Sequence, residues 1–452
     1  MSSIPQEWLQ HAPKPRELKK GENWNVFLSY RSVNRTWVLN LYDILVELDY
    51  KVFMDQFVLK PGDVLIDLLE DALATSQAGV LMWSNAAEDS AWVRKEYNTM
   101  ERKATTNKDF KFIPIKLDAN ELPEFAMNRI FMDFSSYPDG PNGGELLRLL
   151  HGIVGQPMSP ETVRFAAEQD EAADEANEDI KSALRNGYPE DIIALSESDG
   201  LPWRTTPSLG CKAAESLIKL KKNTEAIAIL EKLEVRFPKA IRPKQLHALA
   251  VARLGADTRD PAALKQAQRI LSKLYDTGGG DPETLGIYAR TWMDRYALSN
   301  DVNDLQQSRD YYAEAFKRAP DDYYTGVNAA AKSIFMGTQK AMDEGMTYAK
   351  QVEDLLQKRA EARANGETKV KEDYWEWATA GEVLLMQKKY AEAGETYKEA
   401  IKLARTETGS HESTWKQACR LMEKLKPSDE EKTQVLSAFT HLKDYDKFSE
   451  GS

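Results

Sequence analysis

The sequence predicts an α/β domain with a doubly wound parallel sheet, followed by an all-α solenoid of helix pairs. In the first 155 residues, short apolar runs alternate with segments whose apolar residues recur at helical spacing. After Pro157 the short apolar runs stop, and helical periodicity continues almost to the end of the chain. Alternating strands and helices are typical of a parallel sheet covered on both faces, whereas helices alone are typical of an all-α domain. We therefore expect an α/β domain followed by an all-α domain.

Composition limits the possible functions. A chain of 452 residues exceeds one ordinary hydrophobic core, so two or three domains are expected. Its net charge of −12 argues against broad contact with nucleic-acid phosphates. No apolar run approaches the roughly 20 residues of a membrane span, and the first residues lack the hydrophobic segment of a signal peptide. We therefore expect a cytoplasmic protein that contacts neither membranes nor nucleic acid.

The cysteines and histidines predict no metal site. Cys211 and Cys419 lie far apart in helical sequence, where we expect them as small core residues rather than as a disulfide. Together with five scattered histidines, they show none of the spacings of metal ligands.

The first domain is expected over residues 22–155, after a loose arm over 1–21. Five apolar runs predict strands, and four periodic segments between and after them predict helices. The strands are expected at 24–29, 51–54, 78–83, 112–117 and 130–134, and the helices at 37–48, 65–73, 90–103 and 145–153.

Polar residues end the first three apolar runs. They are Ser29 with Tyr30 and Arg31, then Asp55, then Ser84. Ligands of parallel sheets bind outside the carboxyl ends of the strands, so we expect these residues to converge on one crevice. The helix after the third run carries Trp92 and Glu96 one turn apart on the same face. An aromatic plate beside a carboxylate suits binding and cleavage of a ribosyl compound.

Three segments resemble motifs of TIR domains. Residues 26–31 (VFLSYR) are similar to the first motif box, and residues 59–63 (LKPGD) to the BB loop. Residues 92–96 (WVRKE) resemble the W-x-x-x-E segment of the TIR domains that hydrolyse NAD. The resemblance covers about residues 22–155 and implies a flavodoxin-like doubly wound fold. It is less specific for activity, because many TIR domains are adaptors without catalysis.

The resemblance implies that Glu96 is catalytic and that NAD is the substrate, with no further cofactor. Nicotinamide in NAD is already cationic, so it leaves without a general acid. The transition state resembles an oxocarbenium ion, and one carboxylate can bind the ribose hydroxyls and offset the growing positive charge. The residues expected to bind NAD are Tyr30, Arg31, Ser32, Asp55, Gly62, Ser84 and Trp92.

Several of these residues also have a structural interpretation. Glu96 could be a solvated acid favoured by the dipole at a helix N-terminus. Trp92 could pack in the core, Arg31 could be a surface cation, and Asp55 could cap a turn. Ser90 is expected as the N-cap of its helix.

The second part of the chain is expected to be helical throughout. Residues 156–200 are strongly acidic and alanine-rich, which predicts a connecting helix with a solvated face. From residue 201 to 452 the pattern resembles tetratricopeptide repeats, most clearly over Trp377 to Ile401. The small residues of the second helices are spaced 41, 41, 41 and 44 residues apart, more than the usual repeat of about 34. These residues are Ala226, Ala267, Ser308, Ala349 and Ala393. The longer period is also similar to the "TRAFs-binding" region beside some stress-kinase domains.

Two hypotheses follow. The first is an NAD-cleaving TIR effector, active as a homo-oligomer through its TIR domains, whose repeats bind an unknown protein or ligand. By resemblance, a bacterial protein of this kind would deplete NAD in antiviral defence, with linear ADP-ribose, cyclic ADP-ribose or a base-exchange compound as product. The second is a non-catalytic scaffold that binds protein partners through both domains. The carboxylate of Glu96 favours the first hypothesis without deciding between the two, because an adaptor has no use for it.

Overall fold

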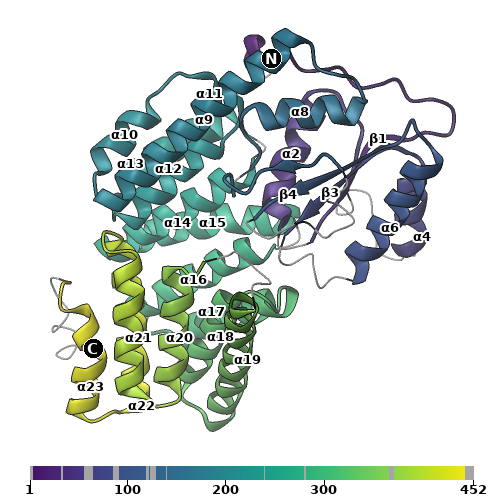
Figure 1. Cartoon of the computed structure of the whole chain (residues 1–452). Coiled ribbons are helices and arrows are strands. Elements are labelled where there is room, and N and C mark those ends of the chain that lie inside the picture. The colour runs from purple at the N-terminus through teal and green to yellow at the C-terminus, as the bar shows by residue number, and fades with distance from the viewer. Residues whose placement is uncertain are drawn as a thin grey trace. The chain divides into compact units, whose positions relative to one another are not determined.

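The chain is described here from a computed structural model (Figure 1), which covers residues 4–31, 34–54, 65–84, 91–118, 122, 129–138, 140–238, 240–278, 281–365 and 371–442. Its contacts divide it into two compact units, and each is described by itself. The first comprises Met1–Ile180, Ala194–Ala213 and Ile229–Lys244, and the second Lys181–Ile193, Ala214–Ala228 and Gln245–Ser452. Among the described helices, none combines the length and apolar character that crossing a bilayer requires.

A five-stranded parallel sheet forms the centre of the first unit (Figure 1). Its strands lie in the order β2-β1-β3-β4-β5. They are β1 (Trp24–Ser29), β2 (Val52–Phe53), β3 (Ser76–Trp83), β4 (Lys111–Lys116) and β5 (Met132–Asp133). The five strands that the apolar runs predict are therefore confirmed, and so is the doubly wound α/β class.

Helices cover both faces of this sheet, because neighbouring residues of a strand point to opposite sides. In β1, Val26 and Leu28 pack in one core cluster with residues of α2 (Arg35–Glu47) and α8 (Gly143–Val154). Phe27 packs in another cluster with residues of α4 (Leu65–Ala74) and α6 (Ala91–Thr106). A strand buried on both sides reads as a continuous apolar run, which is why these strands were visible in the sequence.

The acidic segment after the sheet forms a single helix, α9 (Pro160–Asn186). Some of its acidic side chains form hydrogen bonds with residues near the sheet instead of facing water. Asp170 accepts a hydrogen bond of 3.0 Å from the backbone amide of Glu145, in the first turn of α8. Asp174 accepts one of 2.6 Å from the hydroxyl of Tyr137. A carboxylate at a helix N-terminus stabilises the exposed amides there.

The rest of the described chain is helical, which confirms the all-α second part. Apart from α1 (Gln6–Leu9), the remaining helices are α10 (Pro189–Ser196), α11 (Leu201–Thr205), α12 (Ser208–Lys219), α13 (Asn223–Arg236), α14 (Ile241–Thr258), α15 (Pro261–Gly278), α16 (Pro282–Ser299), α17 (Val302–Arg318), α18 (Tyr323–Met336), α19 (Gln339–Ala364), α20 (Tyr374–Met386), α21 (Tyr390–Leu403), α22 (Thr408–Leu425) and α23 (Asp429–Leu436), with a short 3-10 turn at Ser437–Phe439.

The small residues that mark the repeat lie on alternate helices of the series. They lie on α13, α15, α17, α19 and α21, and all five are buried. A small side chain at such a position lets neighbouring helices approach closely. Cys211 and Cys419 are both buried as free thiols.

Candidate active site

Glu96 lies on α6, and its side chain is buried, with 8% exposure. The hydroxyl of Ser29, the last residue of β1, donates a hydrogen bond to Oε2 of Glu96. The two residues meet for a simple reason. Phe27 faces the α4–α6 layer, and Ser29, two residues later on the same strand, points the same way. A carboxylate is therefore held at the carboxyl end of β1.

This end of β1 is a point where the strand order reverses. The chain places β2 on one side of β1 and β3 on the other, and Ser29 lies opposite Leu81 of β3. In doubly wound sheets, ligands bind in the crevice outside the strand ends at such a switch point, because the connecting loops diverge there. The Glu96–Ser29 pair lies beside the position where a ligand of this fold class is expected.

Two features of the sheet layer fix the position of α6. A Cβ atom on Gly79 of β3 would lie 2.9 Å from the sulfur of Met100, so the glycine leaves room for this α6 side chain to pack directly on the strand. Lys103 donates hydrogen bonds of 2.7, 2.7 and 2.8 Å to the carbonyls of Leu73, Ala74 and Ser76. Burial lowers the pKa of Lys103 to about 8. Met100 and Lys103 lie one and two turns beyond Glu96, so these contacts hold α6 in place close to that residue.

Ser84 and Tyr30 face the other side of the sheet. The hydroxyl of Ser84 donates a hydrogen bond of 2.8 Å to Oδ1 of Asn34, the residue that precedes α2. Tyr30 is half-buried and packs against the core cluster that contains α2 and α8. The strand-end residues thus divide between two faces of the sheet. Ser29 lies on the face that contacts Glu96 of α6, and Ser84 and Tyr30 lie on the opposite face. Contact of Ser84 and Tyr30 with NAD stays a prediction.

The other residues expected to bind NAD are only partly described. Arg31 follows Tyr30 and is half-buried. The backbone of Trp92 lies in the first turn of α6, but its side chain is outside the described residues, as are the whole of Ser32, Asp55, Gly62 and Ser90. Their assigned roles stay predictions.

The sequence placed Ser29 at the crevice but did not pair it with Glu96. The signal that predicts this pairing is the alternation along β1, because it assigns Ser29 to the same face as Phe27. Among the described residues, no group of three or more histidine, cysteine, aspartate or glutamate side chains is arranged to hold a metal ion.

Comparisons with known proteins agree with this architecture. Residues 26–149 match the family model of the TIR domain, and residues 222–333 match the model described as Tetratricopeptide Repeats-Sensor. No curated protein matches the chain. Among solved structures, a human IFIT1 dimer with PPP-AAAA is 14% identical over 68% of this chain and 87% of that chain, with a TM-score of 0.23. A TM-score this low says nothing about the fold or function of the present chain.

Proposed function

We propose that this chain, an N-terminal TIR domain followed by a tetratricopeptide sensor domain, is an effector enzyme that hydrolyses NAD and releases nicotinamide. The observation that carries the proposal is the buried carboxylate of Glu96, held by Ser29 at the carboxyl end of β1. An acid in this position is matched to a substrate whose sugar becomes positively charged during the reaction.

The chemistry requires little more than this carboxylate. When the bond between C1 of the ribose and nicotinamide breaks, the bonding electrons leave with nicotinamide and positive charge develops on the ribose ring. A buried carboxylate stabilises that charge more strongly than a solvated one, because water does not screen it. A carboxylate has about four lone-pair sites, so Glu96 can accept the Ser29 hydroxyl and ribose hydroxyls together. Water then adds to the ribosyl cation.

We assign the regulation to the rest of the chain. The helical repeats act as the sensor, and association of TIR domains from several copies acts as the switch that completes the site. This arrangement fits the antiviral role that the TIR resemblance implies, because NAD depletion must stay off until a signal arrives.

The test is nicotinamide release by purified, concentrated protein incubated with NAD and followed by chromatography. Glu96→Gln keeps the shape of the side chain but removes its charge, so we expect release to fall about 1,000-fold. Ser29→Ala should lower release about tenfold, because the carboxylate loses its orienting donor. Glu70→Gln is the matched control. It removes an exposed carboxylate of α4 that pairs with Lys95, and full release is expected.

Unchanged release by a folded Glu96→Gln variant would contradict the proposal. A second candidate is the non-catalytic scaffold, and one observation favours it. The Glu96 carboxylate already has a hydrogen-bond partner within its own domain, as a purely structural residue would. The scaffold predicts that wild-type protein releases no nicotinamide even when cross-linked into oligomers, and that Glu96→Gln lowers the melting temperature instead.

A further inference from the structure

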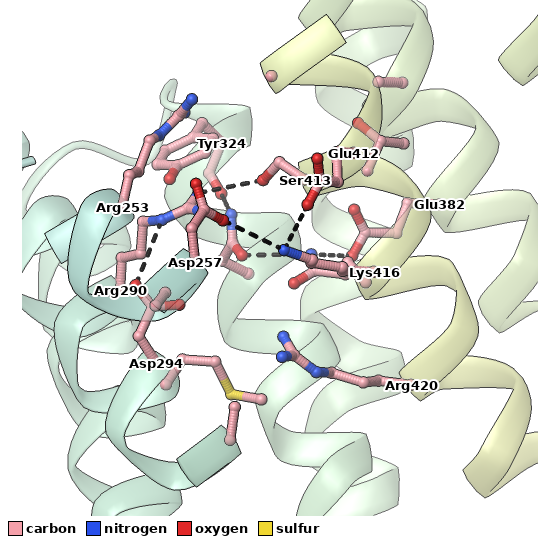
Figure 2. Close-up of a pocket in the computed structure, with 18 of the residues that line it drawn as sticks. Arg253, Asp257, Arg290, Asp294, Tyr324, Glu382, Glu412, Ser413, Lys416 and Arg420 are labelled. Atoms are coloured by element: carbon pink, nitrogen blue, oxygen red, sulfur yellow. Dashed lines mark hydrogen bonds and ion pairs between the residues drawn. The ribbon is translucent and has the colours of Figure 1, made fainter. Parts of the chain in front are cut away.

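The second unit contains a cavity of about 530 Å³ between helices of the repeat. This volume lies within the range of small-molecule sites in proteins. Of the cationic side chains that line it, four come from four different helices: Arg253 of α14, Arg290 of α16, Lys332 of α18 and Arg420 of α22. Figure 2 shows Arg290 and Arg420 extending into the cavity from helices on opposite sides.

Two buried carboxylates, Asp294 and Glu382, lie among these four cations. Arg290 is 3.7 Å from Asp294, measured from Nε to Oδ2. Lys332 is linked to Glu382 through Gln417, whose amide oxygen accepts from Lys332 and whose amide nitrogen donates to Glu382.

The other two cations of the cluster are not neutralised in this way. Within the part of the chain that the structure describes, Arg253 and Arg420 make neither a hydrogen bond nor an ion pair, and Nε of Arg253 is buried. Four cations against two carboxylates leave an excess of two positive charges inside the cavity.

Charges at the edge of the cavity do not remove this excess. Glu412 pairs with Lys221 and, at 2.6 Å, with Lys416, which is also 3.6 Å from Asp257. The two acids are thus matched by two lysines. Figure 2 shows Lys416 pointing towards Asp257.

Burial and neighbouring cations lower the pKa values of two members of the cluster, Arg253 and Lys332. Burial, and then the charge of Arg290, lowers the pKa of Arg253 to about 10. Burial lowers the pKa of Lys332, with Glu382 opposing this and Arg420 and Arg290 adding to it. Buried like charges destabilise a protein unless an anion compensates them.

One wall of the same cavity is aromatic. The rings of Tyr324 and Trp375 lie 6.4 Å apart between centroids and meet at 77°, edge to face. Two rings in this arrangement form a corner, in which a planar group can stack on one ring and contact the edge of the other. Bases of nucleotides bind aromatic side chains in this way.

We propose that this cavity binds a small phosphorylated ligand of the nucleotide class, with its phosphates among Arg253, Arg290 and Arg420 and its planar ring against Tyr324 and Trp375. Guanidinium groups suit phosphate because their planar fork donates two parallel hydrogen bonds. A small ligand is favoured over a peptide because the excess charge lies inside a cavity of limited volume rather than along an extended groove. The proposal goes beyond NAD cleavage and does not depend on it.

The test is calorimetric titration of the full-length protein with ADP, adenosine, pyrophosphate and tetraglutamate. We expect ADP to bind more tightly than adenosine or pyrophosphate, because it alone occupies both the cationic cluster and the aromatic corner. Arg290→Gln and Arg420→Gln should each weaken ADP binding at least tenfold. Arg405→Gln, which removes an exposed arginine of the same unit, should leave it unchanged. ADP contains no nicotinamide, so this result is separate from the outcome of the NAD assay.

A melting experiment distinguishes loss of the site from loss of the fold. Arg420→Met removes a charge that burial disfavours, so the ligand-free variant should melt at a higher temperature than wild type and no longer be stabilised by ADP. A lower melting temperature would indicate a structural role for Arg420 and overturn the proposal. Unchanged ADP binding by both glutamine variants, equal binding of ADP and pyrophosphate, or binding of tetraglutamate alone would also overturn it, the last in favour of an acidic peptide.

Discussion

Both parts of the chain bury glutamate side chains, and Glu96 and Glu382 differ in their neighbours. Glu96 of the TIR domain is 8% exposed and accepts a hydrogen bond from the neutral hydroxyl of Ser29. Glu382 of the repeat region is 7% exposed and lies among cations, linked to Lys332 through Gln417. A hydroxyl orients a carboxylate without cancelling its charge. Burial raises the pKa of Glu382, and the charge of Lys332 opposes that rise. Burial alone therefore does not distinguish these two acids, whereas the charge of their neighbours does.

The largest expected difference between the two glutamates is in their contribution to stability. Glu382→Gln leaves Lys332 and its neighbouring arginines with one carboxylate fewer, so we expect the free energy of unfolding to fall by about 3 kcal/mol. Glu96→Gln removes no such balancing charge and should change it by less than about 1 kcal/mol. Urea unfolding of both variants measures the difference. Equal losses would show that the two carboxylates have the same role.

The sequence predicts the TIR half well because its signals are local. Each buried strand is one apolar run, and Glu96 stands at a fixed distance from Trp92 on one helix. The hydrogen bond from Ser29 was missed, because it joins residues that are 67 positions apart. It could have been inferred only by following the alternation along β1 into the next layer.

The cationic cavity could not be predicted in the same way. Four of its cations come from four helices between Arg253 and Arg420, and each one alone has the appearance of a surface residue in an amphipathic helix. Only the stacking of the helices brings them together. The repeat period itself was readable, since it depends on small residues such as Ala267 that recur in sequence.

A second, smaller effect is a dependence of stability on pH, which we expect in the repeat region. His411 is buried in the repeat region, 2.9 Å from His441 between ring nitrogens. Burial, followed by the charge of His441, lowers the pKa of His411 from 6.5 to about 4. Between these values the unfolded chain binds a proton that the folded chain does not, so stability falls as the pH drops from 6.5 towards 4.

At pH 5 the loss from His411 should be about 2 kcal/mol, since one pKa unit corresponds to about 1.4 kcal/mol. His411→Phe keeps a ring beside Tyr374 and should reduce the dependence of the urea midpoint on pH between 5 and 7. An unchanged dependence would assign the acid sensitivity to other groups.

The smallest expected effects come from alanine substitutions of two glycines, which should change stability in opposite directions. Gly79→Ala forces a methyl group against Met100 and displaces α6, so we expect a loss of 1 to 2 kcal/mol, about the cost of overpacking, together with slower nicotinamide release. Gly286→Ala on α16 meets only ordinary contacts of 3.6 Å and should stabilise the repeat region by about 0.5 to 1 kcal/mol. Thermal melts of both variants measure the signs. Destabilisation by both would show that α16 is packed as tightly as α6.

The arginines around Asp294 should also affect how fast the protein is degraded in a cell. A region that carries surplus buried charge opens more often while its site is vacant, and proteases cleave opened chains. Occupancy of the proposed site would then decide how long each copy survives. A cell short of the ligand would hold a smaller stock of the protein.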